Sequence, residues 1–339
     1  MQQKVLLTGI TGFVGQHCAV ELLNKGYGVR GSLRNMNRKE EVLKGLSKVV
    51  DSADQVEFVT LDLMKDEGWD EAMQDIDFVL HVASPFVVRE PKDENELIKP
   101  AVEGTLRALK AAQKAGVKRV VLTSSIVSMM GDAKGYKSIN QDSWTDVNSK
   151  NISAYIKSKT IAEREAWNFI NNQTGEHQVE LAVVNPGPIY GPTLTGNLAG
   201  ESMNMMSEMI QGKMPAVPQA SCSMSDVRDI AKVHVLAMTN DKAAGKRFIT
   251  TTDKPYAFKD LAKIMKDNGY EKVSTAEAPA FILKIVSLFN RDMKGMRAFL
   301  GNTIDADISL TKETLGWEPI AIEKTIADTA KSVEAALLN

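Results

Sequence analysis

The chain has 339 residues, of which 43% are hydrophobic and 25% charged, and its formal net charge is −2. This length corresponds to about two domains, and the balanced charge gives no electrostatic reason to expect nucleic acid or an acidic membrane as a partner. Two cysteines cannot build a disulfide scaffold, four scattered histidines lack the spacing of metal ligands, and no apolar run has the roughly 18 residues of a membrane helix. We therefore expect a cytoplasmic protein that holds no metal.

Short apolar runs alternate with longer amphipathic stretches in the first two-thirds of the chain. Strands are predicted at 5–7, 28–33, 56–61, 78–81, 119–122 and 180–184, and helices at 13–25, 40–50, 96–114 and 155–172. Strands that alternate with helices of ten or more residues indicate a parallel sheet covered on both faces. The predicted fold class is therefore α/β, a Rossmann-type doubly wound parallel sheet.

The pattern changes after Asn185, where Pro186-Gly187-Pro188 interrupts regular structure. A Met-rich stretch at 201–209 fits a helix whose methionines form a core stripe, the favoured interpretation, or else line a pocket. A strand at 246–250 returns to the sheet, and helices follow at 258–268, 281–289 and 322–338. We expect a first domain over 1–186 with a returning segment near 225–252, and a smaller, mostly helical substrate domain over 187–224 and 253–339.

A glycine-rich turn joins the first strand to the first helix, with the sequence Thr8-Gly9-Ile-Thr-Gly12-Phe-Val-Gly15. Gly9 permits a tight turn, Gly12 lets the backbone approach a pyrophosphate, and Gly15 lets helix and strand pack closely. The helix N-terminus then faces the phosphates. Because the motif follows a strand and precedes a helix, it predicts a dinucleotide site rather than an empty turn.

The end of the second strand indicates which dinucleotide binds. An acidic residue there would accept hydrogen bonds from the ribose 2′-hydroxyl of NAD, but the chain has Arg34, Arg38 and Lys39 instead. A 2′-phosphate needs such cations, so the sequence predicts NADP(H), with Arg34 as the main contact. Further on, Asp62-Leu63 is placed to meet the adenine, and the segment around Val82-Ala83-Ser84 would run along the middle of the cofactor.

Two further segments predict the chemistry. Tyr155 and Lys159 are four residues apart on a helix and share one face, so the cation is expected to lower the pKa of the phenol and to make it a general acid/base. The second segment is Thr123-Ser124-Ser125 at the end of a buried strand. One of its two serine hydroxyls can hold the substrate oxygen at the cofactor crevice.

Taken together, these motifs resemble those of an extended short-chain dehydrogenase/reductase, and more narrowly the dihydroflavonol reductase and cinnamoyl-CoA reductase group, which includes bacterial and fungal aldehyde and ketone reductases. The resemblance spans nearly the whole chain. It is carried by Thr8-Gly-Ile-Thr-Gly-Phe-Val-Gly15, His81-Val-Ala-Ser-Pro85, Lys99-Pro-Ala-Val-Glu-Gly-Thr105, Lys118-Arg-Val-Val-Leu-Thr-Ser-Ser125, Tyr155-Ile-Lys-Ser-Lys-Thr-Ile-Ala-Glu163, Asp226-Val-Arg-Asp229 and Leu315-Gly-Trp-Glu-Pro319.

The resemblance implies a catalytic trio of Ser125, Tyr155 and Lys159 and hydride transfer from NADPH to a carbonyl carbon, with Tyr155 as the proton donor and Ser125 orienting the oxygen. It also implies that Pro186 and the residues after it pass near the nicotinamide. The full set of expected cofactor contacts is Thr8, Gly9, Thr11, Gly12, Phe13, Val14, Gly15, Arg34, Arg38, Lys39, Asp62, Leu63, Val82, Ala83, Ser84, Thr123, Ser124, Tyr155, Lys159, Pro186, Gly187 and Ile189.

The sequence departs from the two plant subfamilies. The stretch Ser153-Ala-Tyr-Ile-Lys-Ser-Lys159 keeps only the tyrosine and the final lysine of the cinnamoyl-CoA reductase segment, and Met130 stands where dihydroflavonol reductases hold the flavonoid with an asparagine. Met130 cannot make those hydrogen bonds, so a smaller or more apolar aldehyde or ketone is expected. The expected pocket walls are Phe86, Met130, Tyr190 and Met205.

Two other functions remain open at this point: a nucleotide-sugar epimerase or dehydratase with tightly bound NAD, and a non-catalytic NADP-sensing regulator. The basic residues after the second strand disfavour the former, and the retained tyrosine and lysine disfavour the latter. The protein is expected as a monomer or homodimer. We also expect Asp226 to cap a helix whose charges join the two domains, and 137–150 to form a solvated loop.

Overall fold

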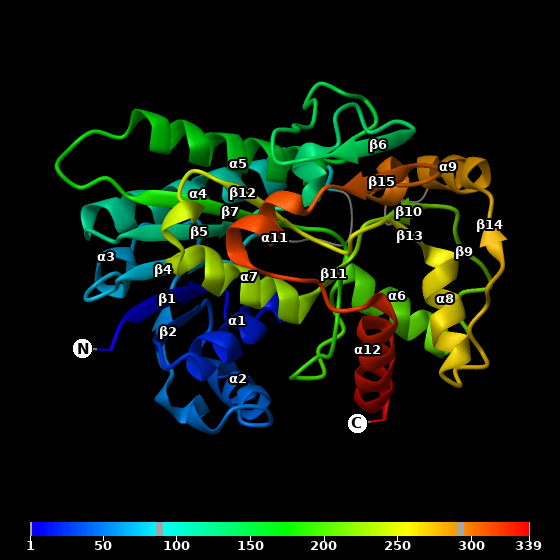
Figure 1. Cartoon of the computed structure of the whole chain (residues 1–339), viewed down its shortest axis with the longest axis horizontal. Helices are drawn as coiled ribbons and strands as arrows, with labels where there is room; N and C mark the ends of the chain where they lie inside the picture. Colours follow the sequence, from blue (N-terminus) through cyan, green and yellow to red (C-terminus); the bar gives the residue numbers. More distant parts are fainter. Residues whose placement is uncertain (1, 86–90, 290–294, 339) are drawn as a thin grey trace.

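The computed structural model describes residues 2–85, 91–289 and 295–338, and its first two-thirds is built on a large parallel sheet (Figure 1). Within those residues the sheet has seven strands in the order β12-β7-β5-β4-β1-β2-β3. They are β1 (Lys4–Thr8), β2 (Gly28–Leu33), β3 (Glu57–Thr60), β4 (Phe78–His81), β5 (Arg119–Thr123), β7 (Glu180–Pro186) and β12 (Arg247–Thr250). The strand order reverses between β1 and β4, and ligands of such sheets bind at the carboxyl ends of the strands beside this switch point.

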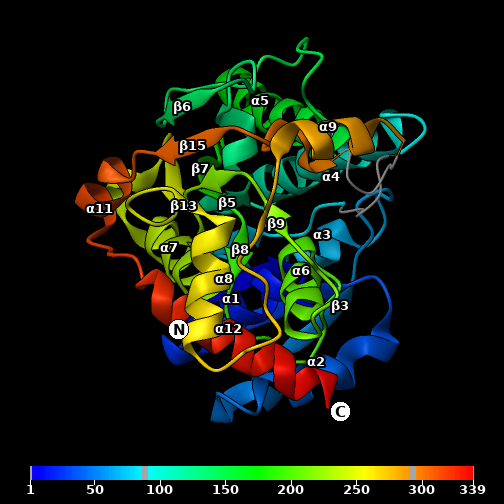
Figure 2. The same cartoon turned by 90° about the vertical axis from the view of Figure 1, so that its right-hand side faces the viewer.

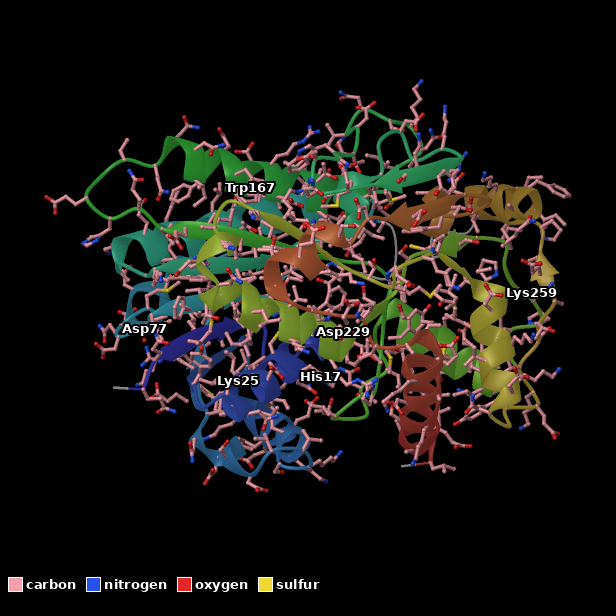
Figure 3. All side chains as sticks on the ribbon, viewed as in Figure 1. His17, Lys25, Asp77, Trp167, Asp229 and Lys259 are labelled. Atoms are coloured by element: carbon pink, nitrogen blue, oxygen red, sulfur yellow. The ribbon has the colours of Figure 1, made fainter. Side chains whose placement is uncertain are left out.

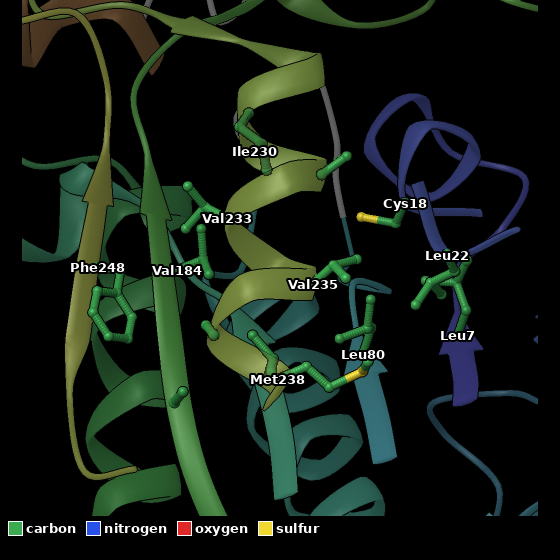
Figure 4. Close-up of a cluster of buried hydrophobic side chains, with 14 of the residues drawn as sticks. Leu7, Cys18, Leu22, Leu80, Val184, Ile230, Val233, Val235, Met238 and Phe248 are labelled. Carbon is green, nitrogen blue, oxygen red and sulfur yellow. The ribbon is translucent and has the colours of Figure 1, made fainter. Parts of the chain in front are cut away.

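Helices cover both faces of the sheet because its strands are apolar on both sides. Side chains alternate along a strand, so Val5 and Leu7 belong to one hydrophobic core and Leu6 to the other. The first core is closed by α1 (Phe13–Asn24), α2 (Lys39–Leu46) and α7 (Val227–Thr239), and the second by α3 (Trp69–Ala72), α4 (Asn95–Lys114) and α5 (Ala154–Asn172). Figure 4 shows α7 packed between the strand that carries Val184 and helix α1, which contributes Cys18. The predicted α/β class and doubly wound sheet are confirmed.

A third core forms where the later helices meet (Figure 2). Helices α6 (Glu201–Ile210), α8 (Phe258–Asp267) and α12 (Ile322–Leu337) enclose it, and the described part of this region also contains α9 (Ala280–Phe289) and α11 (Ser309–Leu315). Met203, Met206 and Met209 are buried in this core with Leu261 and Ile326, so the Met-rich stretch forms a core stripe. None of the described helices is long and apolar enough to cross a membrane.

A small mixed sheet accompanies these helices. Its strands, among the described residues, are β13 (Tyr256–Ala257), β10 (Ser221–Cys222), β15 (Thr303–Ala306) and β6 (Tyr136–Ile139), in that order. Two further pairs join β8 (Ile189–Tyr190) to β11 (Ser225–Asp226) and β9 (Val217–Pro218) to β14 (Glu277–Ala278). The solvated loop expected at 137–150 is therefore partly wrong, because the chain at 136–139 pairs in register with β15.

The start of α7 connects the large sheet with the C-terminal helices. Asp226 caps α7 by accepting from the Arg228 backbone N–H at 2.8 Å and also accepts from the Thr325 hydroxyl at 2.8 Å. Asp229, labelled in Figure 3, accepts from the indole N–H of Trp317 at 3.0 Å and from the backbone N–H of Ile320 at 2.8 Å. The expected capped helix with charged residues joining the two parts is confirmed.

Candidate active site

The turn between β1 and α1 is too tight for side chains at Gly9 and Gly15. Gly9 has a φ of +74°, and a Cβ there would lie 2.9 Å from Cα of Ala83. A Cβ at Gly15 would lie 2.2 Å from the Gly9 carbonyl oxygen, and the Gly12 N–H donates to that oxygen at 2.9 Å. The glycines therefore hold α1 directly against the end of β1.

The N-terminus of α1 is open for an anion. The helix begins after Gly12 with no side-chain cap and no acidic residue in its first turn, so its first N–H groups and the positive end of its dipole face outward. Thr8 ties this turn to the segment after β4, because its hydroxyl accepts from the Ala83 N–H at 3.1 Å and lies 3.0 Å from Nδ1 of His81. Thr11, Phe13 and Val14 lie in the turn or at the start of α1, and 82–84 lie beside it, as expected for residues along a dinucleotide.

The three cations after β2 differ in their surroundings. The Arg38 guanidinium forms two hydrogen bonds to Glu41, at 2.8 and 2.9 Å, and the Lys39 ammonium lies 5.6 Å from the centre of the Phe58 ring. Arg34 is exposed and makes no hydrogen bond or ion pair with any residue in the described ranges. The site thus combines the open N-terminus of α1, the closely packed glycines of the turn and the Arg34 guanidinium, which is available to a ligand. These features fit a dinucleotide that carries a 2′-phosphate.

The predicted adenine contacts follow β3. The side chain of Asp62 accepts a hydrogen bond from the Met64 N–H at 2.9 Å, which fixes the turn there. Leu63 packs its side chain into the space left by Gly104, where a Cβ would lie 2.9 Å from Cβ of Leu63. Both residues lie on the carboxyl side of β3, two strands away from β1 in the sheet.

Ser125, Tyr155 and Lys159 meet at the carboxyl ends of β5 and β7. The Ser125 hydroxyl donates to the carbonyl oxygen of Pro186 at 3.2 Å, and it is hydrogen-bonded to the phenol of Tyr155. Lys159 is buried, and its ammonium donates to the carbonyl oxygen of Thr123 at 3.4 Å. The structure thus brings together the three residues that the sequence singled out for catalysis.

Burial controls the protonation of this trio. It raises the pKa of the Tyr155 phenol, the negative charge of Glu201 raises it further, and the hydrogen bond to Ser125 acts in the opposite direction. The expectation that Lys159 lowers the phenol pKa is therefore wrong for the protein alone, because the loss of water around Tyr155 is the largest influence and raises that pKa. Burial likewise lowers the pKa of Lys159 to about 8, although the charge of Glu163 partly offsets it.

The two adjacent serines face different partners. Ser124 donates to Oε2 of Glu163 at 2.5 Å, whereas Ser125 is the serine in contact with Tyr155. Thr123, the last residue of β5, lies 2.7 Å from Nε2 of His234 on α7. Because Nδ1 of His234 lies 2.8 Å from the Ile230 carbonyl oxygen and must donate to it, Nε2 accepts from the Thr123 hydroxyl.

The residues after β7 turn away from the sheet beside the trio. The Gly187 N–H donates to the Ser225 hydroxyl at 2.8 Å, and a Cβ at Gly187 would lie 2.3 Å from the Ser223 carbonyl oxygen. Pro186 and Ile189 flank this glycine in β7 and β8. Contact of this segment with the nicotinamide stays a prediction.

The described residues that were expected to line the substrate pocket are buried. Phe86 lies outside the described residues. Met130, Tyr190 and Met205 are buried, with exposed fractions of 1%, 0% and 8%, and all three side chains belong to hydrophobic cores. A role in shaping the pocket stays a prediction for these residues.

Sequence reasoning missed the acidic groups around the trio. Glu163, 1% exposed, lies beneath Lys159 on α5, and Glu201 begins α6 within electrostatic reach of Tyr155. The position of Glu163 could have been predicted from the sequence, because Tyr155, Lys159 and Glu163 are spaced by four residues and therefore share one face of the helix. No sequence pattern indicates Glu201, because it reaches the site from a segment that is distant in the chain.

The chain is similar to several known proteins. Residues 5–249 match the NAD dependent epimerase/dehydratase family, and the chain belongs to that family. The chain is 29% identical to the NADPH-dependent methylglyoxal reductase of Saccharomyces cerevisiae over 97% of its own length and 98% of that protein. It is also 29% identical to a cinnamoyl-CoA reductase of Medicago truncatula, over 78% of the chain and 80% of the relative.

Among solved structures, the chain is similar to Gre2 of Candida albicans in complex with NADPH, with a TM-score of 0.80 and 25% identity over 98% of this chain and 99% of that one. The resemblance to extended short-chain dehydrogenase/reductases, and to the group that includes cinnamoyl-CoA reductases, is thereby confirmed.

Proposed function

We propose that the chain is a carbonyl reductase that uses NADPH to reduce small or apolar aldehydes and ketones, with Tyr155 as the proton donor. Its class, an oxidoreductase acting on the CH–OH/carbonyl group, and its cofactor, NADP(H), are confirmed by NADPH-dependent relatives that match it from end to end. The carbonyl assignment depends on one observation above all, the hydrogen-bonded Ser125–Tyr155 pair beside the buried Lys159.

The β1–α1 turn would hold the pyrophosphate of NADPH, and Arg34 would hold its 2′-phosphate. When bound, NADPH supplies the hydride. The buried Lys159 would lie beside the ribose of the nicotinamide, and Pro186 and Gly187 would bound the ring. These residues place the substrate and exclude water, which is the contribution that a reductase fold makes to hydride transfer.

Proton transfer follows from the hydrogen bonds of the trio. The substrate oxygen would accept from Ser125 and Tyr155, which orients the carbonyl carbon. Because burial raises the pKa of Tyr155, the phenol is fully protonated near neutral pH, which is the form needed to donate to the developing alkoxide. The phenolate that this leaves would be stabilised by the Lys159 ammonium on the same face of α5.

The proposed substrate class depends on Met130, one of the residues expected to line the pocket. The side chain of Met130 is apolar and buried, so it offers no hydrogen bond to a polyphenol, and an unpaired polar group in such a site is costly. One relative is named for methylglyoxal, a small carbonyl compound, which supports the same choice. The partner is thus a small carbonyl compound, while a cytoplasmic location and a monomer or homodimer stay predictions.

The test follows NADPH oxidation by absorbance with short aldehydes, α-dicarbonyls, aryl aldehydes, β-keto esters and a dihydroflavonol, with NADH in parallel. Turnover of the smaller carbonyls with NADPH is expected. Turnover of the dihydroflavonol alone would overturn the substrate class. NADPH binding without any turnover would favour a sensing role, and tightly bound NAD in the purified protein would favour an epimerase or dehydratase.

A further inference from the structure

A buried carboxylate lies beneath the catalytic trio. Glu163 is 1% exposed, and its Oε2 accepts three hydrogen bonds: from Ser124 Oγ at 2.5 Å, from Ser128 Oγ at 2.7 Å and from Asn185 Nδ2 at 3.0 Å. Its other oxygen, Oε1, accepts from Arg247 Nε at 2.5 Å. Several hydrogen-bond donors, one of them a guanidinium, therefore converge on this buried carboxyl group.

Arg247 has several partners in this arrangement. Besides Glu163, its guanidinium donates to the carbonyl oxygens of Gln141 and Ser143 at 2.9 and 2.6 Å and to Ser128 Oγ at 3.2 Å. The guanidinium also lies 3.9 Å from the centre of the Trp144 ring. The ion pair is therefore held from several sides, which a buried pair needs if it is to offset its loss of water.

The partners of Glu163 surround Ser125 in sequence and in space. Ser124 precedes it, Ser128 follows it in the short helix at 126–129, and Asn185 precedes Pro186, whose carbonyl oxygen accepts from the Ser125 hydroxyl. The Asn185 amide also donates to the Ser125 carbonyl oxygen at 3.3 Å. One carboxylate thus fixes the backbone on both sides of the Ser125 hydroxyl.

The same carboxylate lies one helical turn after Lys159 and two turns after Tyr155. We propose that Glu163 is a positioning residue of the reductase: it holds Ser125 against Tyr155 through the turn 124–128, and it places its carboxyl group one helical turn from Lys159. The inference rests on the proposed function, because it assigns Glu163 a part in that reaction. If Glu163 had only a structural role in the protein interior, its substitution would lower the stability of the protein and leave kcat unchanged.

The charge of Glu163 matters because Lys159 is close to losing its proton. Burial lowers the pKa of Lys159 to about 8, and Glu163 is the group that raises it. Other titratable groups near this region are Tyr155 on α5 and Glu201 on α6, which acts on Tyr155. Burial keeps two histidines neutral: His81 at the end of β4, with a pKa of about 3, and His234 on α7, with a pKa of about 4. A further charged group there is the Arg247 guanidinium, which is paired with Glu163. Of the two carboxylates, Glu163 alone acts on Lys159.

The experiment compares kcat as a function of pH in the wild type, Glu163→Gln, Glu163→Asp and the control Glu165→Gln, a partly exposed glutamate on the same helix. For Glu163→Gln we expect at least about a tenfold loss of kcat, unchanged NADPH binding, and a fall of kcat at high pH that begins about one pH unit lower. Glu163→Asp should restore the wild-type pH profile, and Glu165→Gln should match the wild type throughout.

Two further variants retain the carboxyl group of Glu163. They therefore distinguish its positioning of Ser125 from its effect on the protonation of Lys159. Each of Ser124→Ala and Ser128→Ala removes one hydrogen-bond donor to Glu163. Both should lower kcat without shifting its pH profile. They test the positioning of Ser125 even if Glu163→Gln does not fold. A wild-type kcat in both serine variants would overturn the positioning of Ser125, and an unshifted profile in folded Glu163→Gln would overturn the effect on Lys159. A wild-type protein that turns over no carbonyl compound would instead overturn the proposed function.

Discussion

The Arg38 guanidinium is clamped by the Glu41 carboxylate through two hydrogen bonds, at 2.8 and 2.9 Å. The same contact raises the pKa of Arg38 and lowers that of Glu41. Four residues earlier, Arg34 has no such partner within the described ranges. The basic loop after β2 therefore contains one guanidinium that is already neutralised and one that is available to a 2′-phosphate.

This difference predicts which arginine selects the cofactor. Arg34→Ala should weaken NADPH binding by about 10- to 100-fold, the effect of losing hydrogen bonds between charged groups, and should leave NADH binding unchanged. Arg38→Ala, the matched control, should have a much smaller effect. Fluorescence titrations with both cofactors measure the four affinities, and an equal loss for NADPH and NADH in Arg34→Ala would contradict the assignment.

Tyr155→Phe tests the proton donor. The change removes only a hydroxyl, so NADPH should still bind, while kcat should fall by about 10²- to 10⁴-fold because no group remains to protonate the alkoxide. Tyr136→Phe is the control, because the Tyr136 side chain is 63% exposed and its hydroxyl bonds to Asp305 far from the trio. Steady-state kinetics with the best carbonyl substrate check the prediction, and comparable turnover in Tyr155→Phe would exclude the role.

The sequence predicts those parts of the fold that follow from local pattern. Apolar runs and glycine spacing place the strands of the large sheet and the β1–α1 turn, because a buried parallel strand and a phosphate turn each impose a local composition. The small sheet escapes prediction, because a strand such as β10 (Ser221–Cys222) has two residues and depends on partners distant in sequence.

The same distinction between local sequence pattern and contacts of distant segments holds within the site. Tyr155 and Lys159 are visible because they share a helix face, and Ser125 because it ends a strand. Their protonation is not visible, since the pKa of Tyr155 depends on how deeply later segments bury it and on Glu201 at the start of α6. Arg247 likewise joins Glu163 only when β12 pairs beside β7.

Buried His234 makes stability depend on pH. Burial lowers its pKa to about 4 from an ordinary value of 6.5, so between these pH values the unfolded chain binds more protons than the folded one. Stability from this group is complete above about pH 6.5 and is lost as pH falls toward 4, by about 3 kcal/mol. His234→Gln should therefore flatten the fall in unfolding free energy over this range. Urea unfolding at several pH values tests this, with exposed His177→Gln as the control that keeps the wild-type slope.

Gly15 tests whether close packing of α1 against β1 creates the cofactor site. A Cβ at this position would lie 2.2 Å from the Gly9 carbonyl oxygen and 3.0 Å from Cα of Ile10, so Gly15→Ala forces α1 away from the strand. We expect a loss of about 1–3 kcal/mol of stability, the usual cost of overpacking, together with a large loss of NADPH affinity as the helix N-terminus moves. Gly200→Ala is the control, because its φ is −79° and a Cβ there meets no atom of the described chain within 4 Å. Calorimetry with and without NADPH measures both effects, and wild-type NADPH affinity in Gly15→Ala would show that the turn does not position the cofactor.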